Sequence, residues 1–352
     1  MLYFCLVRQY VLKLPGRPST YSGMIGRIRS KAQRAFNDII FNTSFGATGI
    51  NDKTGNIILM YHGIDSSGQN LFNGRHTPVA YFEKQVRFLK ANYSLVSLPD
   101  FFKKANSTKN LCAITFDDGY LNNLTNALPV LEKYNAPATF FITGMNEIEC
   151  DILWADFVNI VNKLCTKEVC IDGEDFINNG KGYVSKATGT TLMQIVKSEK
   201  PDYSYKEKIY AVFNPLVNFR QQHQYKEYWQ LMSDEELKKL SASAVVTIGS
   251  HGYYHNNLGN VSNQAAFDEL VKSKKYLENI TQKEVTTLGY PDGSYNDEVS
   301  RYAAQTGMIY QVCTERFNKE ADRSNPYLKN RAGIYNFDSA ANQLLSALNY
   351  PL

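Results

Sequence analysis

The stretch LCAITFDDGY occupies residues 111–120 and joins an apolar run to two acidic side chains. Its first six residues are mostly apolar, which is typical of a strand buried on both faces of a parallel sheet. Asp117 and Asp118 follow the run, and Gly119 allows a tight turn because it lacks a Cβ atom. In barrels of parallel strands, the carboxyl ends of the strands build the active site. The stretch therefore predicts a buried strand whose end carries chemistry, with an ordinary Asp-Gly turn as the structural alternative.

Strands and helices alternate on both sides of this stretch. Six further apolar runs are expected to be strands, at residues 57–61, 93–97, 138–142, 245–249, 285–290 and 308–313. Helical spacing of apolar residues predicts helices at residues 78–91, 122–135, 264–280 and 297–306. A capping box that begins at Ser233 indicates one more helix. Seven strands with helices between most of them predict an α/β fold, a parallel sheet or barrel flanked by helices.

The chain is expected to form one barrel domain with three additions. The barrel spans residues 57–340 and follows an N-terminal extension and linker at residues 1–56, whose last part is rich in Gly, Asn and Thr. Residues 341–352 are expected to be a C-terminal tail. The alternation breaks between about residues 145 and 230, where we expect an insertion on the rim with a hairpin around Asn178–Gly182.

Composition is that of a folded globular protein. Of the 352 residues, 43% are hydrophobic and 20% are charged, so disorder is not expected. The net charge of +4 is too small to predict a nucleic-acid partner. Six cysteines include no CxxC pair; Cys112 and Cys313 lie in expected strands, and Cys165 and Cys170 could bridge, although nothing requires it. We expect a reducing compartment, or no dependence on one.

The N-terminal region lacks the pattern of a secretory signal, because its apolar run stops at Arg8. No apolar run is long enough to span a bilayer. Residues 24–41 mix basic and apolar side chains, which allows either peripheral contact with a membrane or a surface helix packed on the main domain, and we favour the second. The expected location is cytoplasmic, with membrane association if the basic face binds lipid.

A second strand end carries two histidines. Residues 245–258 read VVTIGSHGYYHNNL, with His251 and His255 four positions apart, and the whole chain has five histidines. This spacing can bring two imidazoles to one metal ion, whereas a lone histidine there would more often be structural. Together with one of the two aspartates, the pair forms a three-ligand set that leaves a position for water. Adjacent aspartates point in different directions, so Asp118 could bind the metal while Asp117 accepts a proton.

At this point the chain resembles the NodB-homology polysaccharide deacetylases, carbohydrate esterase family 4. Their first motif, TFDDG, is matched by Thr115–Gly119, and their second, H-[ST]-x-x-H, is approximated by residues 251–255 with Gly252 in place of the hydroxyl residue. The resemblance implies that Asp117 is the general base and that Asp118 and the two histidines bind a divalent metal, with zinc the first expectation. It also implies a distorted (β/α) barrel with fewer than eight strands, in agreement with the seven expected here.

The third family motif is only partly present. It is expected at residues 288–293, LGYPDG, where Tyr290, Pro291 and Gly293 match one branch of the family and Asp292 replaces the usual aromatic residue. The resemblance assigns these four residues to the substrate and oxyanion side of the site. A carboxylate pointing inward would oppose a developing negative charge, so we expect Asp292 to point outward or to accept a hydrogen bond. The arginine that supports the base in the family is missing from this motif, and Arg331 could supply its charge from another strand.

The general acid of the family is a histidine in an L-x-H motif near the C-terminus, which is absent here. Residues 59–62 instead read LMYH, as in the branch of the family whose corresponding strand lies at the N-terminal side, so the resemblance makes His62 the acid. His76 and His223 have no motif around them and are expected at the surface. Trp154 either lines the substrate pocket or packs in the core.

The resemblance implies a metal-dependent hydrolase that removes N-acetyl groups from an amino sugar in a polysaccharide or its precursor. The expected partner is a carbohydrate that contains N-acetylhexosamine. Two alternatives stay open: an inactive member that only binds glycans, because the third motif is altered, and a hydrolase of another amide on the same site.

Overall fold

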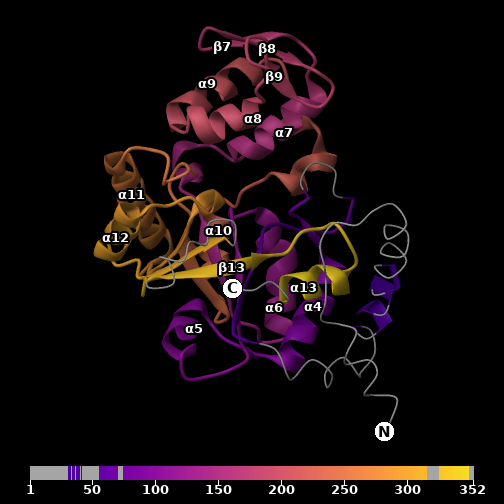
Figure 1. Ribbon diagram of the computed structural model, residues 1–352, viewed down its shortest axis with the longest axis vertical. Coiled ribbons are helices and arrows are strands. Elements are labelled where there is room, and N and C mark those ends of the chain that lie inside the picture. Colours follow the sequence, from indigo (N-terminus) through magenta and orange to yellow (C-terminus); the bar gives the residue numbers. More distant parts are fainter. Residues whose placement is uncertain are drawn as a thin grey trace, which may run out of the picture.

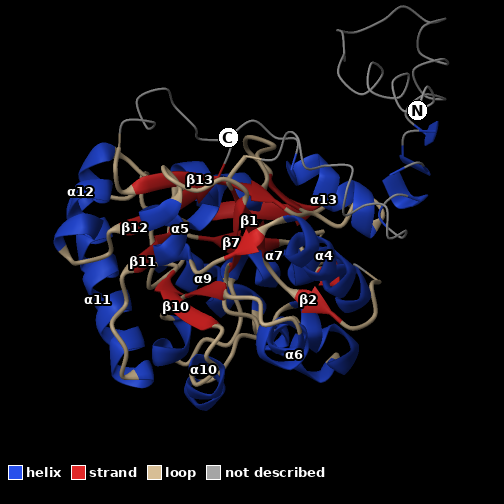
Figure 2. Ribbon diagram, turned by 90° about the horizontal axis from the view of Figure 1, so that it is seen from below, coloured by secondary structure: helices blue, strands red, loops and turns tan. Residues whose placement is uncertain are grey.

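Seven parallel strands close into a barrel in the computed structural model, which describes residues 55–69, 74–314 and 325–348 and several positions between 31 and 41 (Figure 1, Figure 2). Their order round the barrel is β1-β13-β12-β11-β10-β6-β5, and the barrel closes because β5 pairs with β1 from Ile57 opposite Cys112 to Tyr61 opposite Phe116. The strands are β1 (Ile57–Tyr61), β5 (Leu111–Phe116), β6 (Ala138–Ile142), β10 (Val246–Ser250), β11 (Thr287–Gly289), β12 (Tyr310–Thr314) and β13 (Leu328–Gly333). The expected distorted (β/α)7-type barrel is confirmed.

Two strands differ from the sequence-based expectation. The run at residues 93–97 contributes only β4 (Ser94–Leu95), which pairs with the first two residues of β5 and takes no part in closing the barrel. It stops early because Ser97 caps the next helix, α5 (Leu98–Lys104). The seventh strand of the barrel is instead β13, whose polar sequence LKNRAG lacks the apolar pattern by which the other strands were predicted.

Helices cover the outside of the barrel, with α11 and α12 on one side and α4, α6 and α13 on another (Figure 1). Helices α4, α6, α11 and α12 lie where the helical spacing predicted them, Ser233 with Glu236 forms the expected capping box of α10, and α13 was not predicted. Aromatic rings fill part of the core, as where Phe116 stacks on Phe140 with centroids 4.7 Å apart. The helices are α4 (Val79–Asn92), α6 (Leu128–Lys133), α10 (Asp234–Ser241), α11 (Asn263–Thr281), α12 (Asp297–Gln305) and α13 (Ala340–Leu348).

The region expected as an insertion folds over one end of the barrel and has its own buried core (Figure 1). Its hairpin forms where expected: β8 and β9 are antiparallel, with Asn178 opposite Tyr183. Figure 1 places the three short strands above the helices of this region. Its elements are α7 (Trp154–Leu164), β7 (Val169–Ile171), β8 (Glu174–Asn178), β9 (Tyr183–Ser185), α8 (Leu192–Gln194), η3 (Ile195–Glu199) and α9 (Tyr203–Phe213).

The ends of the chain correct one expectation. The C-terminal stretch does not form a tail up to residue 348, because α13 packs on α4, where Gln85 Nε2 donates to the carbonyl of Ala340 at 3.0 Å. Most of residues 1–56, including most of the basic segment 24–41, lie outside the described residues. Among the residues that the structure describes, no helix is long and apolar enough to cross a membrane. Cys165 and Cys170 are both free thiols.

Candidate active site

The carboxyl ends of the barrel strands bring the sequence-predicted residues together. Because all seven strands are parallel, the residues that follow them meet at one end of the barrel. Asp117 and Asp118 follow β5, His251 and His255 follow β10, and His62 follows β1. All five side chains are buried, with at most 6% of each residue exposed.

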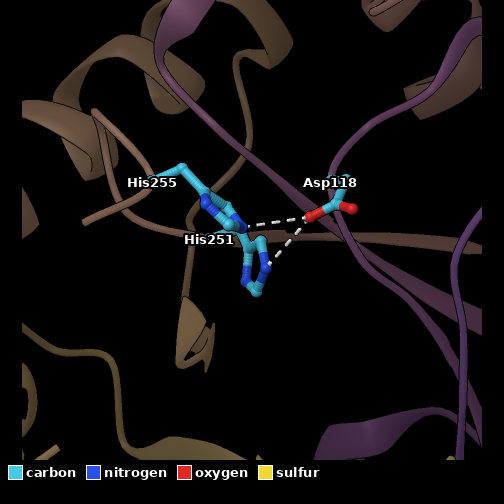
Figure 3. A group of neighbouring side chains, drawn as sticks. All are labelled: Asp118, His251 and His255. Atoms are coloured by element: carbon cyan, nitrogen blue, oxygen red, sulfur yellow. Dashed lines mark ion pairs between the residues drawn. The ribbon is translucent and has the colours of Figure 1, made fainter. Parts of the chain in front are cut away.

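Asp118 and the two histidines converge on one point (Figure 3). Oδ1 of Asp118 lies 3.4 Å from Nε2 of His251 and 3.2 Å from Nε2 of His255. The three potential ligand atoms lie within 4.8 Å of one another. Nδ1 of His251 is 2.7 Å from the carbonyl oxygen of Gly289, which can hold the proton on Nδ1 and leave the Nε2 lone pair facing the carboxylate.

This arrangement fits a divalent cation. Both carboxylate oxygens of Asp118 are buried and accept no hydrogen bond from the described residues. A buried carboxylate without donors is costly unless a cation compensates it. Burial alone would raise the pKa of Asp118, but the two neighbouring imidazoles hold it well below its usual value. One carboxylate and two imidazoles form the open donor set of hydrolytic zinc sites.

Asp117 is held by Arg331 through two hydrogen bonds. Nη1 and Nη2 of Arg331 lie 2.6 and 2.8 Å from the two carboxylate oxygens, and Nη1 also donates to Oγ1 of Thr115 at 3.1 Å. Arg331 lies in β13, is fully buried and stacks over the ring of Phe141 at 5.2 Å. Burial alone would raise the pKa of Asp117, but the charge of Arg331 and then that of His251 lower it. Asp117 is therefore an ionised carboxylate at neutral pH, fixed beside the three converging side chains.

His62 lies in electrostatic range of both aspartates. Its main-chain carbonyl accepts a hydrogen bond from Nδ2 of Asn123 at 2.8 Å, which fixes the turn after β1. Burial and then the charge of Arg75 lower the pKa of His62 to about 4. The ring is thus neutral at rest near pH 7.

His76 corrects a sequence-based expectation, because it is fully buried and not at the surface. Its ring packs against the backbone of Gly63, where an added Cβ atom would come within 2.2 Å of it. Nδ1 of His76 contacts Nδ2 of Asn122 at 3.3 Å, and burial lowers its pKa to about 3. His223 is exposed, as expected.

Side chains of the third motif contact the barrel and the insertion. Tyr290 is fully buried, and its hydroxyl donates to Gln311 at 2.7 Å. The buried Pro291 and Gly293 flank Asp292, whose φ is +52°. Oδ1 of Asp292 accepts a hydrogen bond from Nζ of Lys197 in η3 at 2.8 Å. Asp292 therefore adopts the second of the two arrangements expected for it.

Trp154 belongs to the core of the insertion rather than to an open pocket wall, with 2% of the residue exposed. Nζ of Lys206 lies over its ring at 5.3 Å. Lys206 contacts His255, Lys197 contacts Asp292, and Glu269 contacts the loop around His255, yet no motif in the sequence pointed to these three residues. Lysines in an insertion and a glutamate inside a long helix resemble ordinary surface residues until the fold buries them.

Comparison with known proteins identifies the family. The family model for polysaccharide deacetylases matches residues 104–166 and 202–311, which omits much of the insertion. YxkH of Bacillus subtilis strain 168, named for the same family, is 24% identical over 263 residues; the match covers 73% of this chain but less than two thirds of YxkH, 64%. Both aspartates and both histidines lie in the matched ranges, whereas His62 and Arg331 lie outside them.

Solved structures agree on the fold. The Streptococcus pyogenes deacetylase PplD in complex with acetate superposes with a TM-score of 0.54 at 18% identity, over 84% of this chain and 99% of PplD. A polysaccharide deacetylase from Bacillus cereus gives a TM-score of 0.50 at 21% identity, over 84% of this chain and 69% of its own. The barrel, the motifs and the matched ranges lead to one conclusion: the chain belongs to the polysaccharide deacetylase family.

Proposed function

We propose that this protein hydrolyses N-acetyl groups on an amino sugar, in a polysaccharide or its precursor, and depends on a divalent metal, with zinc the first choice. One observation carries the proposal: Asp118, His251 and His255 converge without hydrogen-bond donors for the carboxylate, directly beside the ionised Asp117. Family membership supports the reaction class. The substrate class is supported by the same relationship.

Asp118, His251 and His255 would hold the metal. When bound there, it would lower the pKa of a water molecule and polarise the acetamide carbonyl. Asp117 would take the proton from that water, because it is ionised and its carboxylate is fixed by Arg331. The bidentate contact leaves the carboxylate little freedom to rotate, so it can face the water without reorganising.

The third motif would stabilise the negative charge that develops on the acetamide oxygen. The amides of Tyr290 and Gly293 already donate, to Val312 at 3.0 Å and to Tyr290 at 2.9 Å. Proline has no amide hydrogen, so this role falls to the N–H of Asp292. The hydrogen bond from Lys197 neutralises part of the Asp292 charge, which lowers its opposition to the oxyanion.

His62 would protonate the departing nitrogen. Its resting ring is neutral because burial and Arg75 depress its pKa. The proton that it delivers would therefore be the one that Asp117 takes from the water, accepted by the ring as negative charge builds up on the substrate. The products are acetate and a free amino sugar.

Acetate release from N-acetylglucosamine oligomers by the zinc-loaded full chain tests the proposal. Asp117→Asn should keep zinc but lose turnover by about 100- to 10,000-fold, because it removes a base and no ligand. His251→Ala should lose both zinc and turnover, because it removes a ligand. Equal zinc loss in the two variants would contradict the division of roles.

The same assay separates the two alternatives. Zinc-loaded protein that binds the oligomers without releasing acetate would indicate an inactive glycan-binding member. Release of acid from simple amides but not from sugars would indicate another amide hydrolase.

A further inference from the structure

The loop that carries His255 forms hydrogen bonds with two buried residues, Lys206 and Glu269, which come from different helices. We propose that Lys206, Asn256 and Glu269 form a polar clamp that fixes this loop in metal-binding geometry, and that the insertion, which supplies Lys206, is therefore an integral part of the metal site. The inference rests on the proposed function only in taking His255 as a ligand. Lys206 and Glu269 are positioning residues, because they act through the loop.

Lys206 reaches the loop from the insertion. It lies in α9 with 2% of the residue exposed. Its Nζ donates to the main-chain carbonyl of His255 at 2.9 Å and to Oδ1 of Asn256 at 2.6 Å, while the ring of Trp154 lies 5.3 Å from it. A buried ammonium group is costly unless its hydrogen bonds are made, so α9 and the loop must keep this spacing.

Glu269 grips the same loop from α11. Its Oε1 accepts hydrogen bonds from the amides of Tyr253 at 3.0 Å, Tyr254 at 2.9 Å and Asn256 at 3.3 Å. Its Oε2 accepts one from Nδ2 of Asn256 at 2.9 Å. The side chain of Asn256 thus bridges the carboxylate and the ammonium group of Lys206. Lys206 thus binds a carbonyl group of the loop, and Glu269 binds three of its amide groups.

The glycine in the second motif makes room for this clamp. An added Cβ atom at Gly252 would lie 2.7 Å from Oε1 of Glu269. Its φ of +74° also favours glycine. Gly252, which replaces the hydroxyl residue of the family motif, therefore leaves the space that the Glu269 carboxylate needs to accept hydrogen bonds from the loop.

The orientation of the His255 side chain depends on this polar clamp. His255 has a φ of +52°, an uncommon conformation for a residue with a side chain. Nδ1 of its ring has no hydrogen-bond partner among the described residues, so the ring is oriented through the backbone. Groups that orient a metal ligand typically contribute 10- to 100-fold to metal affinity.

Zinc affinity of the metal-free full chain, measured by competition with a chromophoric chelator, tests the clamp. Lys206→Met should weaken zinc binding about 10- to 100-fold, since the His255 carbonyl and Asn256 lose their donor. Lys208→Met is the matched control: Lys208 lies on the same helix, is half-exposed and pairs with Asp172 at 2.6 Å inside the insertion. It should leave zinc affinity unchanged.

A role in stability alone would lower the melting temperature of Lys206→Met and leave its zinc affinity at the parent value, which would overturn the inference. If Lys206→Met does not fold, Asn256→Ala decides, because it cuts the bridge and keeps both charges. Unchanged zinc affinity in folded Asn256→Ala would likewise overturn the clamp. A parent that binds zinc but releases no acetate would refute the proposed function alone, whereas an unaffected Lys206→Met would refute the clamp alone.

Discussion

Replacing Arg331 by methionine removes the cation that holds Asp117 and leaves a carboxylate buried without its partner. Arg331 is fully buried and donates to both oxygens of Asp117, to Thr115 and to the carbonyl of Cys313. Breaking a buried ion pair by removing one member typically costs about 3–5 kcal/mol. We expect the free energy of unfolding to fall by that amount at neutral pH, measured by urea denaturation.

The same change should alter the acid limb of the activity profile. With Arg331 absent, burial dominates the environment of Asp117 and raises its pKa, because burial is the largest influence on this group and opposes ionisation. A base must be ionised to act. As the pH is lowered, kcat/KM for acetate release should therefore begin to fall at a higher pH in the variant than in the parent. A shift of one pH unit in that limb corresponds to about 1.4 kcal/mol.

Two further variants separate charge from geometry. Arg331→Lys keeps the positive charge but cannot bond both oxygens, so its acid limb should lie between those of the parent and of Arg331→Met. The double variant Asp117→Asn/Arg331→Met leaves no unpaired charge at the position of this ion pair and should regain part of the lost stability. A folded Arg331→Met protein with the parent's acid limb would refute this account of Asp117.

Two other predictions follow from groups around the site. Asp292→Asn keeps an acceptor for Lys197 and removes a negative charge near the oxyanion, so acetate release should be retained or rise. Asp292→Tyr should not abolish acetate release. Complete loss in both variants would show that turnover requires the Asp292 carboxylate. His62 and His76 have pKa values of about 4 and about 3 in the folded protein, against about 6.5 when unfolded, so the unfolded chain binds more protons as pH falls below 6.5. The free energy of unfolding of the metal-free protein should be highest above that pH. As the pH falls from 6.5 toward the folded-state pKa values, it should decrease by up to about 1.4 kcal/mol per pH unit for each histidine. Urea midpoints that fall equally in the parent and in His76→Asn would contradict the buried neutral state of His76.

The parts of the site that sequence could predict are those that follow strands with apolar patterns. The runs before Asp117 and before His251 are both mostly apolar. Once an apolar pattern identifies such a strand, the residues that directly follow it can be placed at the carboxyl end of the barrel, where active sites lie. The strand before His62, which reads IILMY, was predicted in the same way, whereas the role of His62 came from the family resemblance.

The parts that sequence could not predict depend on burial of polar residues. The strand of Arg331 carries Lys, Asn and Arg, so its periodicity is hidden, although closure of the barrel buries Arg331 completely. The same holds for Glu269, which occupies one position in a 19-residue helix of largely polar sequence. Whether such a residue is buried is decided by long-range packing, and no local pattern reports it.

Closure of the barrel explains why the order of the motifs along the chain matters less than the order of the strands in space. The neighbours of β1 are β5 and β13, so the turn that bears His62 lies between the strand that leads to Asp117 and the strand that carries Arg331. The amide of Asp117 donates to the carbonyl of Tyr61 at 3.0 Å, and Oγ1 of Thr115 donates to the carbonyl of Leu59 at 2.8 Å while accepting from Arg331. These contacts tie three strand ends together although Arg331 and Asp117 are 214 residues apart in sequence. Under the proposed function, β1, which comes first of the barrel strands in the sequence, would supply the proton donor because it lies between the strand that carries Asp117 and the strand that carries Arg331.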